Sequence, residues 1–155
     1  MTITEVRKQS GLTQKEASIL VGIPYRTYIR YEENPSYIGT YKYQKVLEDL
    51  QKAVRIDEEK GLLSIDKIKE LLIPILEKHN ISFCYLFGSY AKGTARENSD
   101  IDLLVDTDIT GLKFFELVEE IRTALHKKID LLRLTDLKSD NPIVLEILKE
   151  GIRLL

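Results

Sequence analysis

The sequence predicts an α+β or α/β protein, with an all-helical N-terminal domain followed by an α/β domain that contains one mixed sheet. Before residue 58, apolar residues recur only at helical spacing. After residue 61, helical segments alternate with short runs rich in β-branched and aromatic residues, which is typical of an α/β layer. A polar stretch at residues 57–61 separates the two patterns, and we therefore place the domains at residues 1–58 and 62–155.

The composition is that of a soluble globular chain and excludes several classes of protein. Hydrophobic residues make up 43% of the 155 residues and charged residues 31%, with a formal net charge of −2, so any contact with nucleic acid would have to be local. Cys84 is the single cysteine, so no intrachain disulfide can form, and its apolar neighbours predict a buried side chain. No stretch approaches the ~20 apolar residues of a membrane helix. The N-terminus lacks the apolar core of a signal peptide, and we expect a cytoplasmic protein without a membrane partner.

Short helices are predicted throughout the N-terminal domain. Thr13 and Glu16 form a capping-box pattern, in which each side chain bonds the backbone N–H of the other residue. The helix that they open is followed by a glycine-containing turn and by a further helix at residues 25–33, which together make a helix-turn-helix. We also expect helices at residues 2–9 and 40–54.

The helix-turn-helix resembles the DNA-binding domain of phage repressors of the Cro/C1, XRE type. The resemblance rests on TQKEA at residues 13–17 and GIPYRTYIRYE at residues 22–32. In that family the second of these segments enters the major groove, which implies operator DNA as a partner. The alternative is a docking or dimerisation module that does not bind DNA, because Lys and Arg barely outnumber Asp and Glu in this region. The residues implied at the DNA are Gln14, Tyr25, Arg26 and Arg30.

The C-terminal domain alternates helices and strands in a way that predicts one sheet with helices packed on it. The expected helices are residues 64–78, 111–126 and 142–149, and the expected strands are residues 81–87, 99–106, 128–134 and 152–155.

Acidic residues interrupt two of these apolar strands. Asp100 and Asp102 are two residues apart in a strand, so their side chains point to the same face. Two neighbouring carboxylates repel each other, and a divalent cation such as Mg²⁺ removes that conflict. Asp130 is a third carboxylate in a nearby apolar strand. Three carboxylates can hold two metal ions that clamp the attacking and leaving oxygens of a phosphoryl transfer.

Gly88 and Ser89 supply the second half of a phosphoryl-transfer site. Glycine lets the backbone approach a ligand closely, and the residues that follow can begin a helix whose free N–H groups face phosphate. The Ser89 hydroxyl adds a hydrogen-bond donor. Lys92 and Arg96 follow closely and can neutralise the charge of a triphosphate.

Together, Gly88-Ser89, SDIDL at residues 99–103 and KIDL at residues 128–131 resemble the minimal nucleotidyltransferase (MNT) domain of the polymerase-beta-type superfamily. The resemblance spans about residues 64–155. It implies that Asp100 and Asp102 are paired metal ligands, with Asp130 as the third carboxylate beside the acceptor hydroxyl. It also implies that the Gly88-Ser89 turn holds the β- and γ-phosphates of ATP. Lys92 stands where the family often has Arg. Lysine keeps the positive charge of arginine but cannot make its bidentate hydrogen bonds to phosphate.

Stand-alone proteins of this kind resemble the antitoxin half of HEPN/MNT toxin–antitoxin pairs. That resemblance implies Mg²⁺-dependent AMPylation, in which AMP passes from ATP to a tyrosine of a cognate HEPN ribonuclease toxin and silences it. A helix-turn-helix fits an antitoxin that also represses its own operon. Two alternatives remain open: a non-catalytic DNA-binding antitoxin that neutralises by binding, and a small-molecule adenylyltransferase of the aminoglycoside type.

Overall fold

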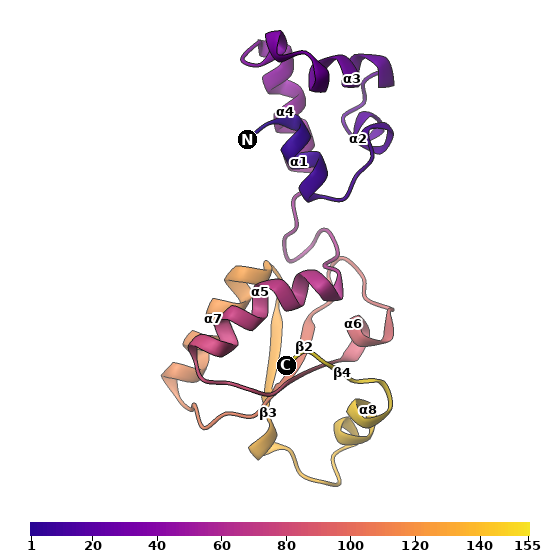
Figure 1. The fold of residues 1–155 in the computed structure, drawn as a ribbon. Helices are drawn as coiled ribbons and strands as arrows, with labels where there is room; N and C mark the ends of the chain where they lie inside the picture. Colours follow the sequence, from indigo (N-terminus) through magenta and orange to yellow (C-terminus); the bar gives the residue numbers. More distant parts are fainter. The chain divides into compact units, whose positions relative to one another are not determined.

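The computed structural model describes residues 1–155, which divide into two compact units, Met1–Arg55 and Ile56–Leu155 (Figure 1). Each unit has a hydrophobic core of its own. No helix in either unit has the length and apolar character that a membrane crossing needs. The assignment of separate functions to residues 1–58 and 62–155 stays a prediction.

The N-terminal unit is all-helical. Both of its first two helices begin with a complete capping box, formed by Thr2 with Glu5 and by Thr13 with Glu16. The second of these boxes confirms the motif predicted from the sequence. The elements are α1 (Ile3–Gln9), α2 (Gln14–Leu20), α3 (Tyr25–Glu33), the 3₁₀ helix η1 (Pro35–Tyr37) and α4 (Tyr41–Ala53).

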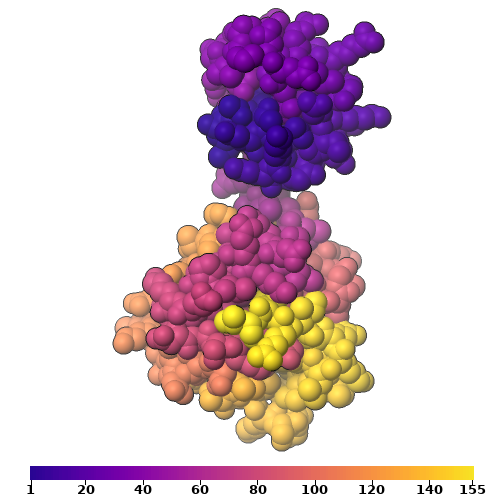
Figure 2. All heavy atoms as spheres, viewed as in Figure 1, coloured from indigo at the N-terminus to yellow at the C-terminus, as the bar shows by residue number.

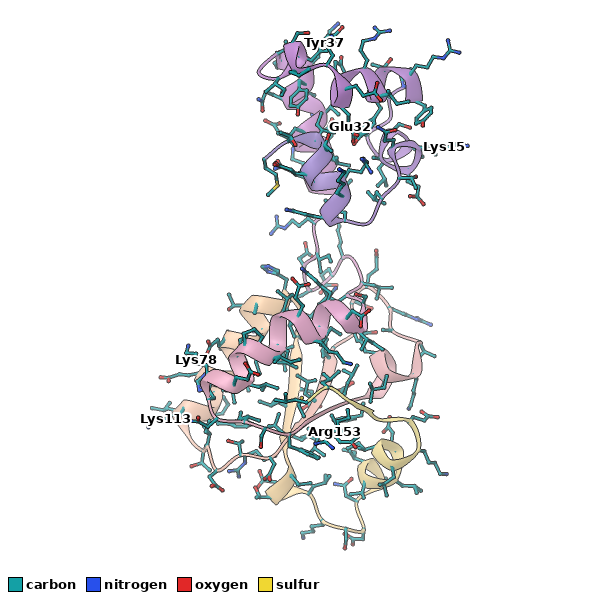
Figure 3. All side chains as sticks on the ribbon, viewed as in Figure 1. Lys15, Glu32, Tyr37, Lys78, Lys113 and Arg153 are labelled. Atoms are coloured by element: carbon teal, nitrogen blue, oxygen red, sulfur yellow. The ribbon has the colours of Figure 1, made fainter.

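A hydrogen-bonded carboxylate ties the first three helices together. Glu32 on α3 lies inside the N-terminal unit (Figure 3), where its side chain is only 4% exposed. Arg7 Nε of α1 donates to Glu32 Oε1 at 2.6 Å, and Gln14 Nε2 of α2 donates to Glu32 Oε2 at 2.9 Å. Burial raises the pKa of Glu32, but these hydrogen bonds outweigh burial and hold the pKa below its usual value.

The C-terminal unit is a mixed α/β layer, as the sequence predicts. Its single sheet has the strand order β3-β2-β1-β4, in which β2 and β3 are parallel and β1 is antiparallel to both β2 and β4. The elements are α5 (Ile65–Lys78), β1 (Cys84–Phe87), α6 (Gly88–Lys92), β2 (Ile101–Val105), α7 (Leu112–Leu125), β3 (Ile129–Arg133), the 3₁₀ helix η2 (Leu134–Asp136), α8 (Pro142–Glu150) and β4 (Ile152–Arg153).

The two faces of the sheet are covered differently (Figure 1). On β2, Ile101, Leu103 and Val105 join the main core with buried residues of α5 and α7. Leu104 points to the opposite face, where it clusters with Ile147 of α8. Because side chains alternate along a strand, Asp102 lies on the α8 face.

Figure 2 shows the C-terminal segment, in yellow, forming part of the surface of this unit.

The strands are shorter than the sequence predicts, whereas the helix bounds agree closely. The first strand begins at Cys84 and not at residue 81, although Ile81 is buried in the core without pairing. The second strand begins at Ile101, because Ser99 closes a turn with Arg96 through two hydrogen bonds. A run of apolar residues in the sequence indicates that the segment is buried. A buried segment need not pair with another strand, so the predicted strands extend beyond the observed ones. Cys84 is buried, as predicted.

Candidate functional site

Two acidic side chains meet on neighbouring parallel strands. In the register of β2 and β3, Asp102 is the direct partner of Asp130. Asp102 is half-buried, whereas Asp130 and Asp100, which precedes β2, are exposed. The sequence placed Asp100 and Asp102 on one face, and the sheet register now adds Asp130 beside them. Asp102 and Asp130 therefore lie side by side on the α8 face, and with the nearby charge of Asp100 they make up the acidic edge of the sheet.

The surroundings of Asp102 at this edge disfavour the ionised form of its carboxylate. Burial, together with the negative charges of Asp130, Asp100 and Glu146, raises the pKa of Asp102 to about 6. Lys92 opposes this shift only in part. A cation bound here would remove the repulsion, so the local charge distribution suits a positively charged ligand or a metal-bound substrate.

The turn between β1 and α6 is pressed against Asp102. Gly88 has φ of +70°, and a β-carbon built on it would lie 2.0 Å from Oδ2 of Asp102. Phe87, the residue before it, pairs with Asp102 across the sheet. Only glycine therefore fits at this position, for reasons of both backbone conformation and space. The Gly88-Ser89 turn and the acidic edge form one continuous site.

Ser89 follows in the first turn of α6, a helix of five residues that ends at Gly93. The Ser89 side chain is half-buried, and its backbone carbonyl accepts hydrogen bonds from the N–H groups of Gly93 and Thr94. Gly93 adopts the left-handed conformation that ends many helices. These backbone bonds fix the loop that carries the predicted phosphate-binding residues.

The two predicted phosphate-binding cations lie in different surroundings. Lys92 Nζ pairs with Glu146 Oε1 at 2.7 Å and with Glu150 Oε2 at 3.8 Å, both on α8. Arg96 is exposed and forms no ion pair. The sequence did not indicate that Lys92 is engaged by acidic residues, because Glu146 and Glu150 lie more than 50 residues further along the chain.

The carboxylates provide hard oxygen ligands, which suit Mg²⁺. However, no group of three or more His, Cys, Asp and Glu side chains lies close enough to hold a metal ion. The sequence predicted that three carboxylates together hold two metal ions, but in the structure the three side chains do not lie close enough to one another to do so. Mg²⁺ usually binds through one or two carboxylates together with substrate phosphates and water, so two neighbouring carboxylates of this edge fit an ion that arrives with a triphosphate.

A buried lysine supports the loop that leads into the acidic edge, and the sequence analysis missed it. Lys127 is fully buried, and its Nζ donates hydrogen bonds to the backbone carbonyls of Glu97 and Lys60. Burial lowers the pKa of this lysine. Lys128, its neighbour, is exposed. Adjacent residues next to a strand point to opposite faces of the sheet. Which of the two lysines faces the core is therefore known only once the pairing of β3 is known.

An apolar cavity of about 520 Å³ lies on the same sheet face, beside α8. It shares Leu104 with the strand that carries Asp102, but it contains no acidic or basic side chain. Its lining consists of Phe83, Tyr85, Leu104, Leu134, Leu137, Ser139, Val144, Ile147, Leu148 and Gly151.

The predicted DNA-contacting residues of the N-terminal unit divide into two groups. Tyr25, Arg26 and Arg30 are exposed on α3, with Tyr25 45% exposed. Gln14 is half-buried, and its amide donates to Glu32 inside the unit. The structure therefore places three of the four side chains where a ligand could reach them and ties the fourth into the fold.

The family described as polymerase beta, nucleotidyltransferase, matches residues 70–155 of this chain. The protein adenylyltransferase MntA of Thermococcus cleftensis is 34% identical over 85 residues, which cover 51% of this chain and 86% of that protein. A similarly classified protein of Methanocaldococcus jannaschii is 40% identical over 73 residues, covering 45% of this chain and 77% of its own length. The family match begins at residue 70, so it lies within the C-terminal unit and leaves the N-terminal unit unmatched.

Among solved structures, a toxin–antitoxin complex with AMP-PNP matches with a TM-score of 0.48 and 28% sequence identity. The match covers 56% of this chain and 72% of that chain.

Proposed function

Since the chain belongs to the polymerase beta nucleotidyltransferase family, we propose that it transfers AMP from ATP to a tyrosine of a cognate HEPN ribonuclease toxin and thereby silences it. Membership of the family makes the chain a nucleotidyltransferase enzyme. The nucleotide, the protein acceptor and the toxin are the parts that we propose. The curated relatives are named protein adenylyltransferases, which supports a protein as the acceptor.

The observation that carries this proposal is the pairing of Asp102 with Asp130, next to the Gly88 turn. A phosphate-facing turn and an acidic edge in direct contact provide both halves of a phosphoryl-transfer site. Asp130 and Asp100 are exposed, so an acceptor as large as a protein can reach them.

In the proposed reaction, the tyrosine oxygen forms a bond to the α-phosphorus of ATP, and the bond between that phosphorus and the β-phosphate bridging oxygen breaks. AMP remains on the tyrosine, pyrophosphate leaves, and Asp130 accepts the hydroxyl proton. Asp100 and Asp102 would hold Mg²⁺, which supplies charge neutralisation for the phosphates when it is bound. The Gly88-Ser89 turn would position the β- and γ-phosphates, and Arg96 would pair with their charge.

We also propose that the N-terminal unit binds operator DNA and represses the operon of the protein. The exposed side chains of Tyr25, Arg26 and Arg30 support this, since they lie on α3, the helix that such domains place in the major groove. Gln14 would contribute only by holding Glu32 and so orienting α3. Cytoplasmic location follows as part of the same proposal, because the toxin and the operon lie there.

The double variant Asp100→Asn with Asp102→Asn tests the enzymatic part of the proposal. Co-expression with the toxin should give no neutralisation, while the folded structure and the binding of DNA stay intact. Full neutralisation by the double variant would contradict an enzymatic antitoxin and would favour one that acts by binding. If the unmodified protein neither transfers AMP to the toxin nor forms a complex with it, a small-molecule acceptor is favoured instead.

A further inference from the structure

The ammonium group of Lys92 is paired with two glutamates of α8, so a ligand would have to compete with them for it. Its ammonium group lies 2.7 Å from Glu146 Oε1 and 3.8 Å from Glu150 Oε2. The two glutamates are four residues apart, so they lie on the same face of α8 and both turn toward α6. The Lys92 side chain is 40% exposed and that of Glu146 is 30% exposed, so the pair is accessible at the surface.

Glu146 also lies close to the acidic edge. Its negative charge is among those that raise the pKa of Asp102, together with Asp130 and Asp100. Glu146 therefore lies near both the cation of α6 and Asp102 of β2. A triphosphate placed on the Gly88-Ser89 turn, with its metal at Asp102, has to bring its negative oxygens into this region.

We propose that Glu146 is a further specificity-determining residue of the nucleotide site, because its carboxylate occupies Lys92 until the β- and γ-phosphates of a triphosphate displace it. The inference rests on the proposed function, since it assumes that the Gly88-Ser89 turn binds ATP. In the nucleotide-free protein, Glu146 neutralises Lys92. When ATP binds, Lys92 exchanges one carboxylate partner for phosphate oxygens, and Glu146 turns toward solvent. The exchange sets the affinity for ATP.

The exchange favours nucleotides with a long phosphate chain. AMP carries no β- or γ-phosphate, so it has no group to compete with Glu146 for Lys92. A partly exposed ion pair changes an equilibrium by about two- to fivefold, and removal of Glu146 also removes its direct repulsion of the phosphates. Glu146→Gln should therefore strengthen ATP binding by about three- to tenfold and leave AMP binding within about twofold of the unmodified protein.

Isothermal titration of the full chain tests this with AMP-PNP and Mg²⁺, and with AMP as the second ligand. Glu150→Gln is the matched control, because it changes the same kind of residue on the same helix at the longer distance of 3.8 Å. It should strengthen AMP-PNP binding by less than Glu146→Gln does. Repeating Glu146→Gln in a Lys92→Met background should remove most of its effect, because no lysine then remains to be released.

The outcomes separate this inference from the proposed function. If the unmodified protein binds AMP-PNP and Glu146→Gln binds it equally or more weakly, the inference is overturned and the nucleotide site stands. If Glu146→Gln strengthens AMP and AMP-PNP equally, general repulsion explains the effect and the exchange at Lys92 is overturned. If no variant binds AMP-PNP, the proposed function fails and the inference fails with it. Strengthening that is confined to AMP-PNP and dependent on Lys92 supports the exchange.

Discussion

Gly88 and Asp102 are in direct contact: a β-carbon on the glycine would lie 2.0 Å from Oδ2 of the aspartate. The glycine belongs to the turn after β1 and the aspartate lies near the start of β2, so the contact joins the two halves of the proposed site. A methyl group there would have to displace the carboxylate. The site thus depends on the absence of a side chain at residue 88 as much as on the presence of one at residue 102.

Gly88→Ala should therefore destabilise the chain and abolish nucleotide binding. The left-handed backbone at φ of +70° costs about 1 kcal/mol for alanine, and displacement of Asp102 adds about 1–3 kcal/mol. Gly93→Ala is the matched control, because Gly93 has φ of +73° with open space around its Cα. Urea denaturation of both variants measures the difference. Equal destabilisation of the two variants would show that the contact with Asp102 costs nothing.

Asp102→Asn should abolish AMP transfer and yet stabilise the metal-free protein at neutral pH. The pKa of Asp102 rises from its ordinary value of 3.8 to about 6 in the folded state, so the folded protein holds this proton more tightly than the unfolded one. Stability from this group is therefore fully present below about pH 4 and is lost as the pH rises through about 6. Asparagine carries no charge to desolvate or repel, and after allowance for partial exposure we expect a gain of about 1–2 kcal/mol at pH 7.

Thermal unfolding between pH 4 and pH 7 in the presence of a chelator measures this prediction. The unmodified protein should lose stability relative to Asp102→Asn as the pH rises across that range. Asp108→Asn is the control, since Asp108 is an exposed carboxylate of the same unit and is not among the charges that raise the pKa of Asp102. Parallel curves for the unmodified protein and Asp102→Asn would mean that Asp102 is not destabilised by its surroundings.

Lys127→Met should destabilise the C-terminal unit by about 1–3 kcal/mol, because the carbonyls of Glu97 and Lys60 would lose their buried donor. Methionine keeps most of the apolar stem, so the effect reports the hydrogen bonds more than the packing. Lys128→Met, at the exposed neighbour, should change stability by no more than about 0.5 kcal/mol. Similar urea midpoints for the two variants would refute a supporting role for Lys127.

Arg26→Ala should weaken binding to operator DNA and lower the slope of log affinity against log salt concentration by about 1 if Arg26 contacts a phosphate. The side chain is exposed on α3, so the substitution should leave the fold intact. Lys113→Ala, an exposed lysine of the other unit, should have no effect. Fluorescence anisotropy with the upstream operon DNA gives the measurement. Absence of salt-dependent binding by the unmodified protein would remove the repressor proposal.

Features fixed by local sequence could be predicted, and features fixed by distant contacts could not. The capping box at Thr13 follows from residues three positions apart, and the helix at residues 25–33 has the predicted bounds. Strand periodicity predicts a common face for Asp100 and Asp102, but β2 begins only at Ile101, so that face stays a prediction for Asp100. The pairing of Lys92 with Glu146 depends on how α8 packs over β1, and no local pattern encodes that arrangement.

Intact-mass spectrometry of the candidate toxin decides whether this chain transfers AMP to a protein. The HEPN-type protein proposed as the toxin is incubated with the full chain, ATP and Mg²⁺, and in parallel with the Asp100→Asn, Asp102→Asn variant. The account predicts that the toxin gains mass in whole AMP units on tyrosine with the unmodified protein and gains none with the variant. A toxin that forms a stable complex with the unmodified protein but gains no mass would contradict the account.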